Sequence, residues 1–358
     1  MIRNGALAPL FFAAHLGLIF FLYPDKMVGI AHFGHWAYIL TGIALEFAML
    51  WLFMKGLAAM PGTPLTTLFR RWGAWTARLL LLPLAVYWFI SLLIVLRIHA
   101  ETLMIIFLPR TPKWVILLVL VLLSLQASLI GLRAVSRATV TLLLLLMPIM
   151  VFSVGACFLN TDVRYLMPLT PDPFFWRSQH YLSSLAAHSG FLFLGMTAAR
   201  WDFSAPRVRR SIYVAMLALV PLYFLAVYIP ILIFLPGNVD KFHYPLTAAF
   251  DTVNIDWLLL DRITMLYVVG SVTFILIFAA LLIKINTELL RDLFLPVSKP
   301  VLSCSLAALA FILCLFVPNW RAVQHFLDMD TPLRMYCGVL IPLVTFTIGK
   351  LARRRRLA

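Results

Sequence analysis

The apolar segment from His180 to Ala199, HYLSSLAAHSGFLFLGMTAA, is long enough to cross a bilayer, but its centre is His188-Ser189-Gly190. These three residues bring hydrogen-bond donors, acceptors and a flexible backbone to membrane depth, where unsatisfied polar groups are costly. Transporters use discontinuous helices of this kind to expose backbone groups to a small ligand. Serine and glycine also allow close helix packing in membranes. The segment therefore predicts either a ligand site or a tight helix crossing.

Two ionisable side chains inside apolar runs could carry proton or ion chemistry. Glu46 lies within TGIALEFAMLWLF, and an ionisable residue inside a span is a functional hypothesis by default. It could couple binding to an ion, or it could be the structural partner of another helix. His188 could hydrogen-bond a ligand or relay a proton, because an imidazole changes its charge near neutral pH. A membrane histidine can also simply bond a neighbouring helix.

Gly17, in the first apolar run AAHLGLIFFLYP, is a second place where the chain could unwind. Together with Ser189 and Gly190 it would offer free backbone N–H and C=O groups, and the N-terminus of a half-helix attracts a carboxylate. The alternative for each glycine is a close contact between two helices.

Other chemistries find little support in the sequence. The spacing of His325 and Asp330 fits a histidine base with a carboxylate partner, but the expected topology places it in an outer loop. His32 and His35 have no third metal ligand nearby, and no phosphate-cradling glycine-rich loop is present. We therefore expect no enzyme activity, no cofactor and no metal site.

The composition indicates which elements position these residues. Hydrophobic residues make up 63% and charged residues 12% of 358 residues, and a mean hydropathy of +0.99 excludes an ordinary soluble domain. Because a span takes about 20 apolar residues, we expect an all-α polytopic protein with ten transmembrane helices in a single membrane domain, 1–358. The expected spans are about 6–23, 33–54, 76–98, 113–131, 138–158, 181–199, 211–235, 257–283, 300–317 and 333–350.

The net charge of +15 follows the sides of the membrane. With the N-terminus inside, most lysines and arginines lie on the inner face, including the run from Arg353 to Arg356. This is the positive-inside pattern, and it predicts that both termini are cytoplasmic. A basic inner face matches anionic membrane lipid, so we expect no nucleic-acid partner.

A loop rich in proline and aromatic residues, LMPLTPDPFFWRSQH, separates two halves of five expected spans, 1–160 and 178–352. Five is an odd number, so the second half would enter the membrane with inverted topology. In such inverted repeats the first helix of each half is the discontinuous one. The candidates are span one, with His15 and Gly17, and span six, with His188-Ser189-Gly190.

Several short motifs, in order and nearly end to end, carry a resemblance to a known family. They are Leu108-Pro109-Arg110-Thr111-Pro112-Lys113-Trp114-Val115, Gly131-Leu132-Arg133-Ala134-Val135-Ser136-Arg137, Tyr165-Leu166-Met167-Pro168, Tyr244-Pro245, Val253-Asn254-Ile255 and Leu260-Asp261-Arg262. In this the chain resembles the spore germination permeases, the B-subunit type of nutrient germinant receptors. The histidines at positions 15 and 188 depart from that family's usual pattern.

The resemblance implies the amino-acid/polyamine/organocation permease fold, a five-plus-five inverted repeat like that of the leucine transporter, with spans one and six discontinuous. It implies a germinant-sensing subunit that works beside A and C subunits in the inner membrane of a dormant spore. In this fold the ligand cavity would also be lined by Tyr87 of span three and by Ser271 and Thr273 of span eight.

The function we predict is binding of a small nutrient, most simply an amino acid, in a midplane pocket between spans one, three, six and eight. Binding would stabilise one of two conformations and so pass a signal. Two alternatives stay open. The chain could be a secondary amino-acid transporter coupled to protons or another ion through Glu46 or His188, or a component of a nutrient-gated ion channel.

Overall fold

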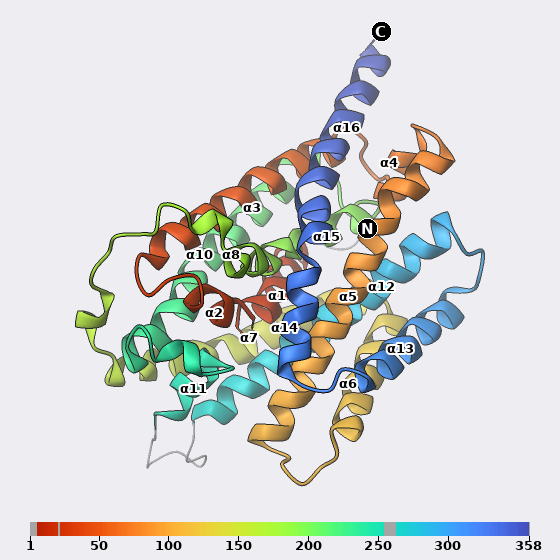
Figure 1. Cartoon of the computed structure of the whole chain (residues 1–358). Helices are drawn as coiled ribbons and strands as arrows, with labels where there is room; N and C mark the ends of the chain where they lie inside the picture. Colours follow the sequence, from red (N-terminus) through yellow and green to blue (C-terminus); the bar gives the residue numbers. More distant parts are fainter. Residues whose placement is uncertain (1–5, 21, 254–262, 358) are drawn as a thin grey trace.

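The computed structural model describes residues 6–20, 22–253 and 263–357, and within them the chain is helical without a β-strand (Figure 1). Seven of the described helical segments are long and apolar enough to cross a membrane. They are α3 (His35–Ala58), α5 (Ala74–Ile106), α6 (Lys113–Ile130), α7 (Leu132–Cys157, continued by η2, Phe158–Asn160), α10 (Pro206–Phe234), α12 (Ile263–Leu293) and the joined helices α15 (Thr331–Met335), η7 (Tyr336–Leu340) and α16 (Ile341–Leu357).

The other three expected spans fall on interrupted or shorter helices. Expected span one consists of α1 (Leu7–Ile19) and α2 (Leu22–Val28), whose axes differ by 50°. Expected span six consists of α8 (Gln179–Ser184), η5 (Leu185–Phe193) and α9 (Leu194–Thr197). The ninth is α13 (Lys299–Leu315), of 17 residues. Helix length supports seven spans in the described chain, or eight with the bent pair, so it does not confirm the count of ten.

Local sequence explains where several of these helices begin and end. Gly131 lies between α6 and α7 with φ of 100°, a conformation open to glycine but strained for other residues. Pro206 and Pro300 occupy the first turns of α10 and α13, where a missing N–H is harmless. The motif residues Asn254-Ile255 and Leu260-Asp261-Arg262 lie outside the described residues.

Helix α12 is the centre of the bundle. It packs against α1, α5, α6 and α7, and its most apolar window is 72% buried, compared with 28% for α7. A helix that is hydrophobic on all sides belongs in the interior. Helix α1 lies beside it and also contacts α10 and η5, so both discontinuous segments run through the core rather than along the lipid face.

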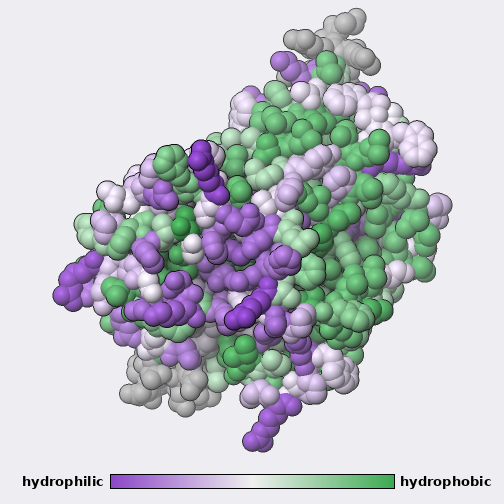
Figure 2. All heavy atoms as spheres, in the orientation of Figure 1, coloured by the Kyte–Doolittle hydropathy of each residue, from purple (hydrophilic) through white to green (hydrophobic). Residues whose placement is uncertain are grey.

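The surface divides into an apolar and a polar region. Figure 2 shows apolar residues over α5, α6 and α13, where Leu82, Leu122 and Ile312 are exposed, as expected for helices that face lipid tails. Polar residues gather near α8 and the amphipathic helix α14 (Trp320–Met329). The remaining short elements are α4 (Leu65–Arg70), η3 (Val163–Leu166), η4 (Phe175–Arg177), η6 (Val239–Lys241) and α11 (Pro245–Asp251).

Candidate ligand and proton site

The segment around His188-Ser189-Gly190 is not a regular α-helix. Residues Leu185–Phe193 form the nine-residue 3₁₀-helix η5, although such helices are rarely longer than four residues. Across from it, Tyr336–Leu340 form the π-helical turn η7, which contacts η5. Irregular turns within helices often mark functional sites. Here two of them are in contact, the buried η5 and the half-buried η7.

Glu46 of α3 lies at the centre of this region, and its side chain is fully buried. Its Oε1 lies 2.8 Å from Nε2 of His15 on α1, and its Oε2 lies 2.8 Å from Nδ1 of His188 on η5. The hydroxyl of Tyr223, on α10, is 3.1 Å from Oε2 and also 3.1 Å from the carbonyl of Ala187. One carboxylate therefore joins α1, α3, η5 and α10.

Contacts other than those with Glu46 also fix the two imidazole rings. Nδ1 of His15 donates to the carbonyl of Phe11 at 2.8 Å. The ring of His188 stacks on Tyr223 with centroids 4.5 Å apart, and the ring of Tyr23 packs edge-on against it at 5.5 Å. Fixed rings of this kind set which nitrogen of each histidine faces Glu46.

Two glycines leave room for these rings. A Cβ atom at Gly42 would lie 2.7 Å from Nε2 of His188, and a Cβ atom at Gly190 would lie 2.7 Å from Cε1 of His15. Real Cβ atoms do not approach heavy atoms so closely, so any other residue at either position would displace an imidazole. Gly190, from the His188-Ser189-Gly190 stretch, thus provides the space that the ring of His15 occupies.

A small cavity of about 30 Å³ adjoins the cluster, and Glu46, His188, Ser189 and Arg334 are among its lining residues. This is space for little more than one water molecule. The hydroxyl of Tyr87 donates to Oγ of Ser189 at 2.5 Å, and Ser189 donates to the carbonyl of Ala186 at 2.7 Å.

Arg334 is a cavity residue that sequence reasoning did not single out as part of the site. It is 2% exposed, and its terminal nitrogens bond the carbonyls of Leu182 and Leu327 and Oδ2 of Asp330. Its Nε–H has no partner among the described residues. The only available signal was an arginine in the apolar run TPLRMYCGVL, since charges within a span are costly unless they have a function.

The structure brings together Glu46, Tyr87, His188, Ser189 and Gly190 but not the other three predicted ligand residues. Gly17 packs on α12, where an added Cβ would lie 3.0 Å from Cδ1 of Ile275. Ser271 is buried and donates to the carbonyl of Val268, whereas Thr273 is partly exposed and donates to that of Val269. The cavity lies against α3, η5 and η7.

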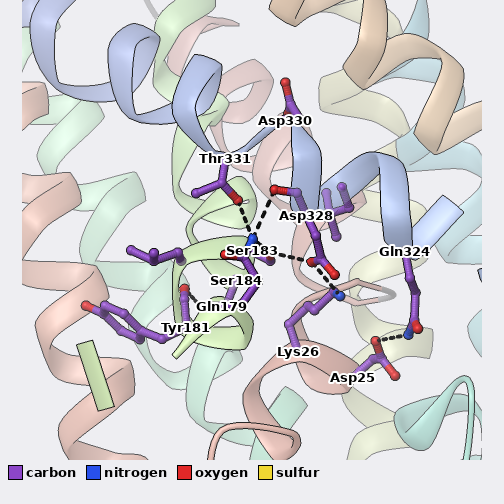
Figure 3. A network of polar contacts seen from close by, with 12 residues as sticks. Asp25, Lys26, Gln179, Tyr181, Ser183, Ser184, Gln324, Asp328, Asp330 and Thr331 are labelled. Carbon is purple, nitrogen blue, oxygen red and sulfur yellow. Dashed lines mark hydrogen bonds and ion pairs between the residues drawn. The ribbon is translucent and has the colours of Figure 1, made fainter. Parts of the chain in front are cut away.

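A second polar cluster links α2 and α8, one piece of each discontinuous helix, to α14 and α15 (Figure 3). We call it the outer cluster because it reaches the protein surface at Asp328, whose side chain is 35% exposed. Lys26 of α2 is 3.0 Å from Oδ1 of Asp328, which also accepts from Ser183 of α8 at 2.7 Å. Gln179 donates to the carbonyl of Asp328 and to Thr331. Because Arg334 bonds Leu182 of α8, this outer cluster continues to the cavity.

A helical membrane bundle with two interrupted helices in its core has the leucine-transporter-like fold. The solved structure of MhsT in complex with L-phenylalanine aligns with a TM-score of 0.64 at 14% identity, covering 98% of both chains. A mutant form of an Eremococcus coleocola manganese transporter aligns with a TM-score of 0.60 at 13% identity, covering 98% of this chain and 77% of the other. These similarities establish the fold.

The family is established by sequence. Residues 2–320 match the family described as spore germination protein, and the chain belongs to it. No curated protein matches. Family and fold together make the chain a multi-pass membrane protein of the permease class rather than an enzyme, as the motifs from Leu108 to Arg262 predicted.

Proposed function

We propose that this chain is the B subunit of a nutrient germinant receptor, which binds a small nutrient, most simply an amino acid, in the cavity at Ser189. The observation that carries the proposal is the cavity itself. It joins the irregular helix η5, the hydroxyl of Ser189 and the buried guanidinium of Arg334, whose Nε–H has no partner among the described residues. A carboxylate would supply the missing acceptor.

The amino-acid class is supported by the chemistry of the lining residues. An arginine with a free N–H group is suited to a carboxylate, and Glu46 can attract a cationic amine from across the cavity. A solved structure of the same fold holds L-phenylalanine. The cavity of about 30 Å³ is too small for an amino acid, so binding requires α3, η5 or η7 to move apart.

That movement provides a route to a signal. The outer cluster of Lys26, Ser183 and Asp328 holds α2, α8 and α14 together, and a ligand that binds only the opened or only the closed arrangement shifts the balance between them. In this proposal A and C subunits read that balance in the spore inner membrane. Both termini lie in the cytoplasm, and the single membrane domain 1–358 contains the repeats 1–160 and 178–352.

Two alternative functions use the same cavity. An ion-coupled amino-acid transporter is favoured by the buried cluster of Glu46, His15 and His188, because such clusters are typical of proton relays in transporters. A nutrient-gated channel component would open a path along the same helices. Transport and sensing differ in whether the ligand crosses the membrane.

The test is ligand-dependent thermal stabilisation of the purified chain against the common amino acids, inosine and simple sugars. We expect an amino acid to stabilise the protein, and Arg334→Gln to weaken its affinity by roughly 10–100-fold, because a hydrogen bond to a charged group contributes about 1.5–3 kcal/mol. Arg334→Lys keeps the charge but removes Nε, and it should also weaken binding. Arg321→Gln, at an exposed arginine of α14, is the matched control.

The same assay can contradict the proposal. An unchanged affinity in both Arg334 variants would show that the ligand does not bind at this cavity. Stabilisation only by inosine or sugars would show that the ligand is not an amino acid. Uptake of a bound ligand into proteoliposomes then separates the functions, because accumulation against a gradient indicates a transporter and binding without uptake a sensor. Co-purification with A- and C-type subunits tests the receptor assembly.

A further inference from the structure

The hydrogen-bonding capacity of His15 fixes the number of protons around Glu46. A carbonyl oxygen only accepts, so the 2.8 Å bond to Phe11 requires the hydrogen of His15 to be on Nδ1. In a neutral imidazole Nε2 then carries a lone pair. That atom lies 2.8 Å from Oε1 of Glu46, and neither atom has a hydrogen-bond partner elsewhere among the described residues.

Two lone pairs 2.8 Å apart would repel, so the close approach of Oε1 and Nε2 indicates that Glu46 and His15 share one proton. The proton can lie on Oε1, which makes both groups neutral, or on Nε2, which makes them an ion pair. On the other side, Nδ1 of His188 lies 2.8 Å from Oε2, and it donates to that oxygen when the neutral ring carries its hydrogen on Nδ1. In both arrangements the three side chains together carry no net charge, which is the state that a fully buried site favours.

We propose that His15, Glu46 and His188 form a proton-binding site that holds one exchangeable proton between Glu46 and His15, and that this proton is coupled to the cavity at Ser189. The coupling rests on the ligand site proposed above, whereas the proton site does not. When α1, α3 and η5 move apart to admit a ligand, the contact opens. The proton then passes to water in the cavity and leaves a carboxylate and two neutral imidazoles.

The donor set fits a proton better than a metal ion. Ca²⁺ and Mg²⁺ need about six oxygen ligands, whereas Glu46 presents two oxygens, each already 2.8 Å from a ring nitrogen. The two histidines face different oxygens instead of a common point. No group of three histidine, cysteine or acidic residues in the described chain is placed to hold a metal.

The groups that surround the site come from every helix packed on it. Tyr23 of α2 and Tyr223 of α10 contact the ring of His188, and Tyr87 of α5 bonds Ser189. Arg334 faces the site across the cavity and is paired with Asp330. Asp330 lies just outside the last span, and burial, opposed by Arg334, raises its pKa to about 6.

Glu46→Gln is the decisive variant, because glutamine reproduces the protonated site without a proton to lose. Its amide N–H can donate to Nε2 of His15, and its carbonyl can accept from Nδ1 of His188. The volume is unchanged, so the variant should fold. The first experiment measures the thermal midpoint of the purified full chain and of this variant between about pH 5 and pH 9 without ligand.

We expect the thermal midpoints of wild type and Glu46→Gln to diverge at alkaline pH. Ordinary histidines lose their proton near pH ~6.5, so above that pH the unfolded chain binds fewer protons at these residues than the folded site, and stability falls as pH rises. Wild type should lose several degrees of midpoint more than Glu46→Gln between about pH 7 and pH 9. Equal losses in the two proteins would overturn the proton site.

Asp330 does not confound this comparison. Its raised pKa means that it contributes most to stability below about pH 4 and loses that contribution as pH rises through about 6. Asp330→Asn in both backgrounds should therefore change the acid side and leave the alkaline difference. Stabilisation by Mn²⁺ or Zn²⁺ that is lost in Glu46→Gln would overturn the proton assignment in favour of a metal.

The second experiment tests the coupling. A mixture of the common amino acids is added to weakly buffered protein containing a pH indicator. Wild type should exchange about one proton per ligand bound. Glu46→Gln lacks the charge that attracts a cationic amine, so it should bind more weakly, and at saturating ligand it should exchange no proton. Equal proton exchange in both proteins would overturn the coupling. If the mixture stabilises neither protein, the proposed ligand class fails, whereas the alkaline difference decides the proton site by itself.

Discussion

The two discontinuous segments, α1–α2 and α8–η5–α9, contact other helices through two polar clusters, an inner one and an outer one. The two clusters are chemically different. At the inner level His15 and His188 meet Glu46, whose side chain is fully buried. At the outer level Lys26, whose side chain is 1% exposed, and Ser183 meet Asp328, whose side chain is 35% exposed. A fully buried ionic contact is costly to break because its partners lose their compensation. At the outer level Asp328 reaches water, so hydration can replace part of the lost contact on its side.

This comparison suggests a division of roles along the same pair of helices. The outer contact should open at a lower cost than the inner one, because water can reach Asp328, and this suits a gate. The inner contact opens only when something replaces its lost partner, which suits a site that responds to a ligand. Substitutions in the two clusters should therefore differ in their effects on stability and on ligand binding.

The largest effect is expected from Glu46→Ala. Removing the carboxylate leaves two buried imidazoles without their shared partner and a void beside the cavity, and breaking a buried pair in this way typically costs about 3–5 kcal/mol. Glu46→Gln, which keeps both hydrogen bonds, should cost much less. Thermal unfolding in the same detergent measures the difference. Similar losses in the two variants would mean that charge, not hydrogen bonding, holds the cluster.

An intermediate effect is expected from Gly190→Ala and Gly42→Ala. Each added methyl group meets a pinned imidazole at 2.7 Å, and overpacking a buried site costs about 1–3 kcal/mol. Both variants should also weaken the pH dependence attributed to the shared proton. Gly155→Ala of α7 is the control, because nothing lies within 4 Å of its Cβ and alanine favours a helix. Equal effects at Gly155 and Gly190 would contradict the claim that Gly190 makes room for the ring of His15.

The smallest effect on stability is expected from Lys26→Gln. Lys26 is buried, but Asp328, the partner that remains, is 35% exposed and still accepts from Ser183. Water can hydrate it, so the loss should cost about 1 kcal/mol. Ligand association should become faster, because the outer contact opens more readily. Stopped-flow binding measures that rate, and Lys241→Gln, at an exposed lysine, is the control. A stability loss as large as that of Glu46→Ala would erase the difference between the two levels.

The residue types of the inner site were visible in the sequence, but their pairing was not. Glu46 and His188 were predicted because ionisable residues inside apolar runs are costly. His188 lies 142 residues from Glu46, and no local pattern joins residues so far apart. Tyr223 and Arg334 occur among many aromatic and basic residues, so only the packed structure distinguishes them.

The fold was predicted more completely than the site. Apolar runs and family motifs indicated a helical permease. The interrupted segments are the two that contain His15 and His188, although α1 is regular at Gly17 and ends at Ile19. The ninth expected span is the 17-residue helix α13, because hydropathy alone does not define helix ends. Ser271 and Thr273 were expected at the cavity from the position of their span, yet both hydroxyls bond their own helix. That outcome is common for serine and threonine within helices and leaves no mark in the sequence.

The two glycines that make room for the histidines constrain how this site can change during evolution. Because Gly190 makes space for His15, and Gly42 for His188, the imidazoles and the glycines form two matched pairs drawn from opposite halves of the chain. A relative that has a larger residue at position 42 or 190 would have to forgo the facing histidine. Gain or loss of the proton site would then be a joint event, and the four positions would vary together across the family.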